Sequence, residues 1–440
     1  MKHISQKTVL AFTTALILLT ALYGCNKTKT SGGSAAAAAA GNTAERQRTA
    51  ATPPPARTED PVKDWYNPES KVFEISKAGQ LAGLAKIVNS GNSFKGKTII
   101  ITADIDLSGY HANSSFNEGR GWVPIGSKRS VFKGTFDGNG KVVRGLYINN
   151  PKLFYAGLLG RLDSAVVKNL SVTEANITAH SRAGAVAGGI GNSSVEHCYS
   201  SGTVKGNGFI GGVVGYSYRR SKVSDSYSES SLGGENYIGG VAGDLDGGSI
   251  VERCYSAGKV SGEAAVGGVA GGIQGRGSRV SNSYSTAKIE SGSKGGGIAG
   301  LVIQGGNIKN CYSTSEVTGR TYIGGIAGQI ADTLSNCVAL NKSVKATVGV
   351  AGRLRGHSDG KMLLKNAAFI GMMNKDGNAE WLNKTDKGKI KAKDGLDITK
   401  EQIKADGTFG GLFTLENGWT TEDGKLPGFG SALTLPDHLR

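Results

Sequence analysis

The sequence predicts an all-β fold, a β-solenoid (β-helix) of about eight rungs of 28 residues, with a cap at each end. The main observation is a glycine-rich phrase, such as Phe209–Gly215, that returns eight times between residues 155 and 352. Its closing glycines stand at positions 160, 188, 215, 243, 271, 300, 328 and 352. A spacing this regular is typical of stacked repeats, each of which buries its apolar face against the next.

A second repeated phrase distinguishes β rungs from helical ones. Each copy begins with a β-branched or leucine residue and most end in Tyr-Ser: Val195–Ser200, Val223–Ser228, Val251–Ser256, Val280–Ser285, Ile308–Ser313 and the degraded Leu334–Ala339. Short β-branched and aromatic runs between Gly, Ser and Asn residues favour strands. Helical repeats would need Leu/Ala/Glu-rich segments of about ten residues, which are absent here. Each rung should therefore advance the coil by about 4.8 Å.

The N-terminus has the pattern of a bacterial lipoprotein signal. Lys2 and Lys7 precede an apolar run over residues 9–22, and Cys25 follows it. We predict a signal peptide over 1–24, a lipid anchor on Cys25 and a flexible tether over 25–62, because the run is short for a membrane span. An ordinary secretory signal or one membrane helix is the alternative. The predicted location is the bacterial cell envelope, lipid-anchored at the outer membrane or cell surface.

Residues 63–154 and 361–440 are predicted to flank the repeat solenoid of residues 155–360. In the first segment, apolar residues at helical spacing behind Ser76 predict an amphipathic helix, and strands follow before residue 155. This segment would supply the N-terminal cap and the first solenoid strands. The second segment is predicted to be a small α/β cap with a short helix at Thr399–Lys404. Its large apolar residues are Trp381, Phe409, Leu412, Phe413, Trp419 and Leu426.

Several phrases before the repeats resemble the lead-in of bacterial GLUG-repeat surface proteins. They are Phe73–Ile75, Asp104–Ser108, Trp122–Gly126, Phe132–Gly140 and Gly145–Ile148, followed by the Gly-Leu-any-Gly core at Gly157–Gly160. The resemblance covers roughly residues 70–430. It implies an adhesin-like β-solenoid at the cell surface, and it supplies no catalytic residue.

The charge balance and two basic loops suggest a binding surface. Lys and Arg exceed Asp and Glu by 51 − 35 = 16. The loops that precede two of the Val-Ser-x-Ser-Tyr-Ser copies are basic, so alternate rungs could form a ribbon for acidic polysaccharide or host surface and matrix components. Charge scattered for solubility is the alternative, and no aromatic-and-basic motif favours nucleic acid. The candidate ribbon contains Arg219, Arg220, Lys222, Arg276 and Arg279, and could extend to Arg353 and Arg355.

Two further columns repeat along the rungs. Tyrosines stand at positions 199, 227, 255, 284 and 312. If Tyr199, Tyr227, Tyr255, Tyr284 and Tyr312 face outward, they could form a stacking platform for sugars, and if they face inward, they form a structural ladder. In the neighbouring column, Cys198, Cys254 and Cys311 alternate with serines, which indicates a two-rung repeat unit of 56 or 57 residues. Only Cys311 and Cys337 occupy neighbouring rungs, and buried free thiols are expected.

The candidate chemistry favours binding over catalysis. The six histidines include no His-Glu-x-x-His pair, so neither a metal nor another cofactor is predicted. Asp225, Asp244, Asp246 and Glu252 do not share one column, and no acidic or basic cluster on adjacent rungs is apparent. The predicted function is that of a monomeric, non-enzymatic surface lipoprotein that binds extended or acidic glycans. The alternative is a carbohydrate-active enzyme or an accessory module of a secreted hydrolase.

Overall fold

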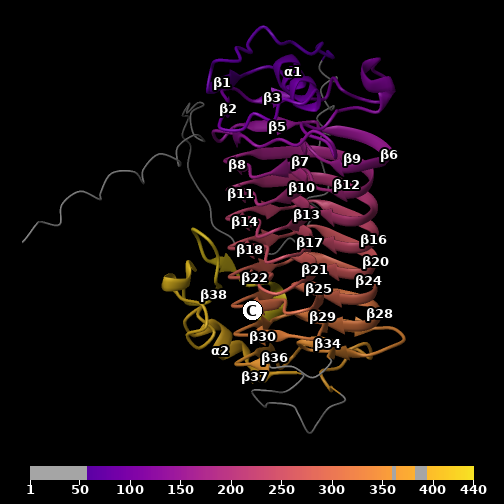
Figure 1. Ribbon diagram of the computed structural model, residues 1–440. Helices are drawn as coiled ribbons and strands as arrows, with labels where there is room; N and C mark the ends of the chain where they lie inside the picture. The colour runs from indigo at the N-terminus through magenta and orange to yellow at the C-terminus, as the bar shows by residue number, and fades with distance from the viewer. Residues whose placement is uncertain (1–56, 359–362, 382–393) are drawn as a thin grey trace, which may run out of the picture. The chain divides into compact units, whose positions relative to one another are not determined.

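The computed structural model describes residues 57–358, 363–381 and 394–440, and it confirms the predicted β-solenoid. The strands stack rung upon rung along one axis (Figure 1). The predicted signal peptide, Cys25 and nearly all of the predicted tether lie outside the described residues. Within the described part, no helix combines the length and the hydropathy needed to cross a membrane.

Two parallel sheets form two sides of the coil. The first sheet contains β1 (Val72–Ile75), β2 (Thr98–Ile101), β4 (Thr135–Asp137), β8 (Val166–Lys168), β11 (Ser194–Glu196), β14 (Lys222–Ser224), β18 (Ile250–Glu252), β22 (Arg279–Ser281), β26 (Asn307–Lys309), β30 (Thr333–Ser335) and β35 (Leu363–Leu364). The second sheet contains β7 (Leu159–Asp163), β10 (Ala187–Gly191), β13 (Val214–Tyr218), β17 (Ala242–Leu245), β21 (Ala270–Gln274), β25 (Ala299–Ile303), β29 (Ala327–Ile330) and β34 (Arg355–Ser358).

A third set of parallel strands completes each rung, and we call it the third sheet. Its members are β3 (Ile105–Asp106), β5 (Val142–Arg144), β6 (Tyr147–Ala156), β9 (Ser171–Ala183), β12 (Tyr199–Gly211), β15 (Tyr227–Ser228), β16 (Ser231–Gly239), β19 (Tyr255–Ser256), β20 (Lys259–Gly267), β23 (Tyr284–Ser285), β24 (Lys288–Gly296), β27 (Tyr312–Ser313), β28 (Val317–Gly324), β31 (Val338–Ala339), β32 (Val344–Ala346), β33 (Ala351–Gly352), β36 (Ala367–Phe369) and β37 (Leu396–Ile398). Each repeat thus contributes one strand or strand pair to every side.

The solenoid has about eleven turns, so the prediction of about eight was too low. The second sheet has the eight strands that the glycine phrase predicts, but the first sheet has eleven. The three additional strands are β1, β2 and β4, which pair in parallel register with one another and with β8. They lack the glycine phrase, and therefore the repeat count missed them.

The core is a column of inward side chains held in register. In the first sheet, Val167, Val195, Val223 and Val251 are aligned and fully buried. The same column continues upstream through Phe136, so larger residues fill the first rungs. Burial of each such side chain contributes roughly 1.5–3 kcal/mol. The in-register apolar column therefore stabilises the stack of rungs.

The flanking segments contain the helices. The predicted N-terminal helix is α1 (Ala78–Asn89), which begins two residues after Ser76. The backbone nitrogens of Ser76 and Lys77 both donate to Gln80 Oε1, which fixes that start. The predicted C-terminal helix is α2 (Lys400–Lys404), which Thr399 caps by accepting from the backbone nitrogen of Gln402.

Residues 400–440 run beside the later rungs, and we call them the side segment (Figure 1). The segment carries β38 (Lys425–Leu426), which pairs with β39 (Leu433–Thr434). Its large side chains Phe409, Phe413 and Trp419 are buried. They contact the ring of Tyr312 on the third sheet. The side segment therefore covers part of the outer face of the rungs.

Candidate functional site

The structure brings five of the seven predicted basic residues to one edge, between the second and first sheets. This basic edge consists of Arg219, Arg220, Lys222, Arg276 and Arg279. The turn at Gly247 and Gly248 separates the two loops, since a Cβ at Gly248 would lie 3.4 Å from Arg220 Cγ and 3.7 Å from the carbonyl oxygen of Arg276. Arg219, Arg220 and Arg276 are exposed and form no ion pair with another described residue. The edge thus presents unpaired cations on both sides of a glycine turn.

A depression lies on the other side of Arg219 and Arg220. Its volume is about 420 Å³, and hydroxyl and amide groups from the two preceding rungs line it together with the cations. The residues that define it are Ser164, Asn192, Ser193, Ser194, Arg219, Arg220 and Lys222. Hydroxyl donors beside guanidinium groups are suited to a sulfate or carboxylate group.

The backbone of the basic edge is strained. Arg219 and Arg220 have φ angles of 55° and 60°. The stacked residues of the next rung are Gly247 and Gly248, with φ angles of 60° and 83°. A left-handed conformation costs an L-residue roughly 1–2 kcal/mol. Ser164, Asn192 and Gln304 have positive φ angles at the same corner in other rungs, so this conformation belongs to the corner of the coil.

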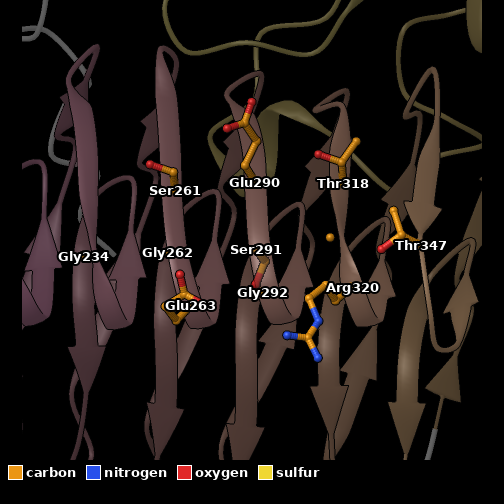
Figure 2. Close-up of a pocket in the computed structure, with 11 residues that line it drawn as sticks. Gly234, Ser261, Gly262, Glu263, Glu290, Ser291, Gly292, Thr318, Arg320 and Thr347 are labelled. Atoms are coloured by element: carbon orange, nitrogen blue, oxygen red, sulfur yellow. The ribbon is translucent and has the colours of Figure 1, made fainter.

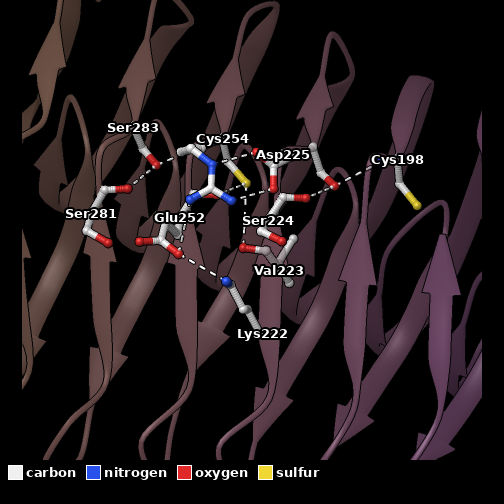
Figure 3. A network of polar contacts seen from close by, with 11 residues as sticks. Cys198, Lys222, Val223, Ser224, Asp225, Glu252, Cys254, Ser281 and Ser283 are labelled. Atoms are coloured by element: carbon white, nitrogen blue, oxygen red, sulfur yellow. Dashed lines mark hydrogen bonds and ion pairs between the residues drawn. The ribbon is translucent and has the colours of Figure 1, made fainter. Parts of the chain in front are cut away.

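Part of the basic edge is neutralised by neighbouring acids. Figure 3 shows Lys222 pointing toward Glu252, and their Nζ and Oε2 atoms are 3.1 Å apart. In the same network, Arg253 forms a bidentate pair with Asp225 at 2.6 and 2.7 Å. Burial, the largest single cause, acts to raise the pKa of Asp225, but the hydrogen bond and the charge of Arg253 together with smaller contributions outweigh it and lower the pKa. Lys222 therefore contributes less free charge than Arg219, Arg220 or Arg276.

Arg353 and Arg355 do not join the ribbon, so that extension was wrong. Arg353 is fully buried, and its Nη1 lies 2.6 Å from Asp397 Oδ1. Its backbone nitrogen donates to Asp394 Oδ1 at 2.9 Å. Arg355 begins strand β34 and aligns with Ala327 at the start of β29, away from the loops that carry the basic edge.

The burial of Arg353 follows from its place in a glycine column. A Cβ at Gly297 would lie 2.1 Å from the carbonyl oxygen of Gly325, and a Cβ at Gly325 would lie 2.1 Å from that of Arg353. From Gly212 to Gly325 the position is therefore glycine in every rung, whereas Ala185 occupies it in an earlier rung. Arg353 lies two residues before β34, the last strand of the second sheet, so a side chain is allowed. It pairs with the segment that follows the last rungs.

The tyrosine column faces outward. In each rung the residue before the tyrosine, such as Cys198, and the residue after it, such as Ser200, are buried, whereas Tyr199 is half-buried. The rings of Tyr227 and Tyr255 are stacked with centroids 4.6 Å apart at 10°, and those of Tyr255 and Tyr284 with centroids 4.9 Å apart at 5°. The faces of these rings contact one another, so the column presents ring edges and hydroxyl groups. It is not the open stacking platform that an outward column suggested.

The side segment covers the later end of this column. Tyr284 and Tyr312 are 4% and 0% exposed, whereas Tyr199 and Tyr227 remain half-buried. Tyr312 donates its hydroxyl hydrogen to the carbonyl oxygen of Pro427. Burial, the largest cause, raises the pKa of Tyr312 well above its usual range. The column is therefore buried under the side segment at its later end and partly exposed at its earlier end.

The four described cysteines are free and buried, as predicted. Burial raises the pKa values of Cys198 and Cys254 to about 12, so both thiols stay protonated. The serines that lie between the cysteines in this column accept hydrogen bonds from backbone nitrogens. Ser226 Oγ accepts from the backbone nitrogen of Cys198, and Ser283 Oγ accepts from that of Cys254 (Figure 3). The Cys/Ser alternation thus satisfies backbone donors at this corner.

Sequence reasoning missed an arginine and aromatic cluster that is formed by residues of the third and second sheets. The guanidinium of Arg182 lies 5.1–5.4 Å from the ring centroids of Tyr155, Phe209 and Tyr216. Arg161 donates to the hydroxyl oxygen of Tyr218 through two nitrogens, at 3.1 and 3.2 Å. Tyr155, Arg182 and Phe209 each open a copy of the glycine phrase on successive rungs, so the alignment of the copies already placed them in one column. The contacts of Arg182 with Tyr216 and of Arg161 with Tyr218 depend on how the second sheet lies beside that column.

Asp244 is a buried acid beside this cluster. It is 2% exposed, and Gln274 Nε2 donates to both of its carboxylate oxygens at 3.0 Å. Burial raises its pKa to about 7, although the hydrogen bond from Gln274 opposes the shift. The neighbouring Asp246 adds to the increase. Asp244 therefore titrates near neutrality.

A shallow groove crosses the third sheet (Figure 2). It has a volume of about 510 Å³, and its floor is formed largely by glycine backbone. Glu263, Glu290 and Arg320 lie along it on adjacent rungs. The sequence showed no acidic or basic cluster on adjacent rungs, and the structure places two glutamates and one arginine along this groove. Glu263 and Arg320 occupy the same repeat position with Gly292 between them, whereas Glu290 lies two residues before that position.

Glu290 of the groove is paired with two lysines. Glu290 lies 2.7 Å from Lys259 Nζ and 3.2 Å from Lys288 Nζ. The hydrogen bond from Lys259, the largest cause, lowers the pKa of Glu290. A carboxylate held ionised in this way is a poor general acid. Across residues 57–358, 363–381 and 394–440, no three His, Cys, Asp or Glu side chains are grouped to hold a metal ion.

The stacked parallel rungs define a β-solenoid repeat protein. Residues 179–205 match the family described as "Glug: The GLUG motif", which supports the GLUG resemblance for the repeats. These residues extend from the end of β9 through β10 and β11 to the start of β12. The match covers one repeat. The other rungs are related to that repeat by the register of their strands.

Two curated proteins are similar to part of the chain. Halomucin of Haloquadratum walsbyi is 37% identical over 137 residues, which are 31% of this chain and 2% of halomucin. A "Putative Gly-rich membrane protein" of Evansella cellulosilytica is 33% identical over 107 residues, which are 24% of this chain and 11% of that protein. The chain thus spans a small fraction of the length of these relatives.

One solved structure is similar over most of the chain. It is described as a "putative immunoglobulin A1 protease from Bacteroides ovatus". The match covers 82% of this chain and 93% of that structure, with 17% sequence identity and a TM-score of 0.44.

Proposed function

We propose that this protein binds acidic polysaccharide through the basic edge, without catalysis and as a monomer. The observation that carries the proposal is the placement of Arg219, Arg220 and Arg276 around one glycine turn, free of ion pairs with described residues. The hydroxyl-lined depression beside Arg219 supplies donors for one sulfate or carboxylate group. The second loop can contact a further group of the same polymer, about 9.6 Å along the axis.

Heparin is a suitable probe because its charge is dense and regular. We expect the full chain to bind immobilised heparin at low salt and to dissociate as salt rises, because exposed charges are screened within about 10 Å at 0.1 M salt. The triple substitution Arg219→Ala, Arg220→Ala and Arg276→Ala should weaken binding by about tenfold or more and flatten its salt dependence.

A matched control removes the same charge elsewhere. Lys95, Lys152 and Lys205 are exposed and lie outside the basic edge. Replacing all three with alanine should leave heparin binding nearly unchanged. Equal losses in both triple variants would show that net charge, rather than the basic edge, governs the interaction.

The proposed setting is the cell envelope, with a lipid on Cys25 and the binding surface outside the membrane. The names of the two relatives, a mucin and a membrane protein, support this setting. Cys25→Ala should move the chain from the membrane fraction to the soluble fraction without changing heparin binding. Retention of the variant in the membrane fraction would contradict the lipid anchor.

The second candidate function is carbohydrate cleavage in the groove of Figure 2. The observation that favours it is the presence of Glu263, Glu290 and Arg320 on adjacent rungs. We expect no depolymerisation of neutral or acidic polysaccharides, because Glu290 stays paired with two lysines. Cleavage that is lost in Glu263→Gln and Glu290→Gln would reverse the order of the two candidates.

A further inference from the structure

A second pocket lies where the side segment crosses the tyrosine column. Its volume is about 500 Å³, within the range of small-molecule sites. Tyr255, Tyr284, Thr286 and Thr314 line it from the rungs, and Leu433 is among the residues that line it from the side segment. The two walls are more than eighty residues apart in the chain. The pocket therefore exists only where the side segment lies against the solenoid.

The lining combines apolar surface with hydroxyl groups. Leu426, Leu433 and Pro436 form apolar surface on the side-segment wall. Thr286 and Thr314 supply hydroxyl groups from adjacent rungs, and both side chains are at least partly exposed. A sugar ring has the matching chemistry, since its C–H face is apolar and its edge carries hydroxyl groups.

The charged groups of the pocket balance one another. Glu316 and Lys342 lie 3.8 Å apart. His438 Nε2 lies 2.8 Å from the carbonyl oxygen of Leu340. Burial, the largest cause, lowers the pKa of His438, so the imidazole is neutral near pH 7. The pocket thus has no excess charge to attract an anion or a cation.

The aromatic residues of the pocket favour a hydroxylated ligand over a flat one. The rings of Tyr255 and Tyr284 are nearly parallel and use their faces for each other. A flat aromatic ligand therefore meets ring edges. Burial raises the pKa values of both phenols, so their hydroxyl groups remain donors. Among the described residues, neither phenol forms a hydrogen bond.

We propose that this pocket binds a neutral saccharide of one or two sugar units. The site is separate from the basic edge and does not depend on it. The tyrosine column supplies one wall, and the side segment supplies the other. Such a site would recognise the end or a branch of a glycan, whereas the basic edge would follow a charged polymer.

The test uses the full chain with three neutral probes: maltotriose, cellotriose and the trimer of N-acetylglucosamine. Binding is measured by saturation-transfer NMR and titration calorimetry. We expect at least one probe to bind with a millimolar or lower Kd. The double variant Thr286→Val and Thr314→Val keeps the side-chain shape and should weaken binding by about tenfold or more.

Two controls separate this site from the others. Thr318→Val removes a hydroxyl from the groove of Figure 2 and should leave saccharide binding unchanged. The Arg219, Arg220 and Arg276 alanine variant should also retain it, and Thr286→Val with Thr314→Val should retain heparin binding. The proposal is overturned if no probe binds at millimolar concentration. It is also overturned if the threonine variant binds like the wild type, or if the loss follows the basic edge.

Discussion

The earlier and later rungs are built from the same columns, but they differ in what covers them. In the earlier rungs, Tyr199 is half-buried and Arg219 is exposed. In the later rungs, Tyr312 and Arg353 are fully buried, because the side segment covers the tyrosine and residues 394–398 lie against the arginine. The same residue types thus serve as surface in one half and as core in the other. The position of a residue in its repeat fixes the direction of its side chain. Whether that side chain is exposed or buried depends on the segment that packs over it.

The largest expected contrast is between the two ends of the tyrosine column. Tyr312→Ala should lower the free energy of unfolding by about 3–5 kcal/mol, because it removes a ring that packs against Phe409, Phe413 and Trp419. Tyr199→Ala should cost about 1 kcal/mol, since it removes one half-exposed ring contact with Tyr227 and an exposed hydrogen bond to Glu229. Denaturant titration measures both values. Equal losses would show that stacking within the column, rather than the side segment, stabilises Tyr312.

Arg353 tests the same contrast for a charged residue. Arg353→Met keeps most of the side-chain volume but leaves Asp397 without its partner. We expect a loss of about 2–3 kcal/mol, below the usual cost of breaking a fully buried pair, because Asp397 is 33% exposed. Arg276→Met, on the exposed edge, should change stability by no more than about 0.5 kcal/mol. A neutral Arg353→Met variant would show that the end of the coil needs no ion pair.

Much of the fold could be predicted from the sequence, because the fold repeats. The eight copies of the glycine phrase predicted the strands of the second sheet. The strands β1, β2 and β4 could not be counted, because they share the register without the phrase. The role of Arg353 needed three-dimensional knowledge, since it depends on the absence of a following rung in the second sheet.

The candidate sites could be predicted only in part. Arg219, Arg220 and Arg276 were found because their loops differ from those of other repeats. The side-segment pocket was missed, since Tyr255 and Leu433 meet through a contact that no periodicity encodes. The charge of Lys222 was overestimated for the same reason, because Glu252 lies on the next rung. Repetition predicts what lies along a column, but not what lies across from it.

Asp244 is a buried acid in the earlier rungs, which are more exposed. The pH dependence of the protein's stability measures how completely this carboxyl group is buried. Its pKa is about 7 in the folded state and 3.8 in the unfolded state, so the folded state binds more protons between these values. Its contribution to stability is therefore lost as pH rises from about 4 to about 7. Asp244→Asn should match the wild type near pH 4 and exceed it above pH 7, by at most about 4 kcal/mol.

Thermal unfolding across this pH range measures the Asp244 difference. Asp423→Asn is the control, since Asp423 is exposed. It should follow the wild-type curve at every pH. A constant offset for Asp244→Asn, independent of pH, would mean that the carboxyl group is already ionised in the folded state near pH 4.

The smallest expected effect concerns the backbone of the basic edge. Arg220 has a φ of 60°, and the residue stacked on it is Gly248. Arg220→Gly should relieve the strain but increase the freedom of the unfolded chain, so stability should stay equal or rise by up to about 1 kcal/mol. Heparin binding should fall at the same time. A variant that gains stability while it loses binding would show that the strained arginine is retained for the ligand, whereas a clear loss of stability would assign Arg220 to the fold.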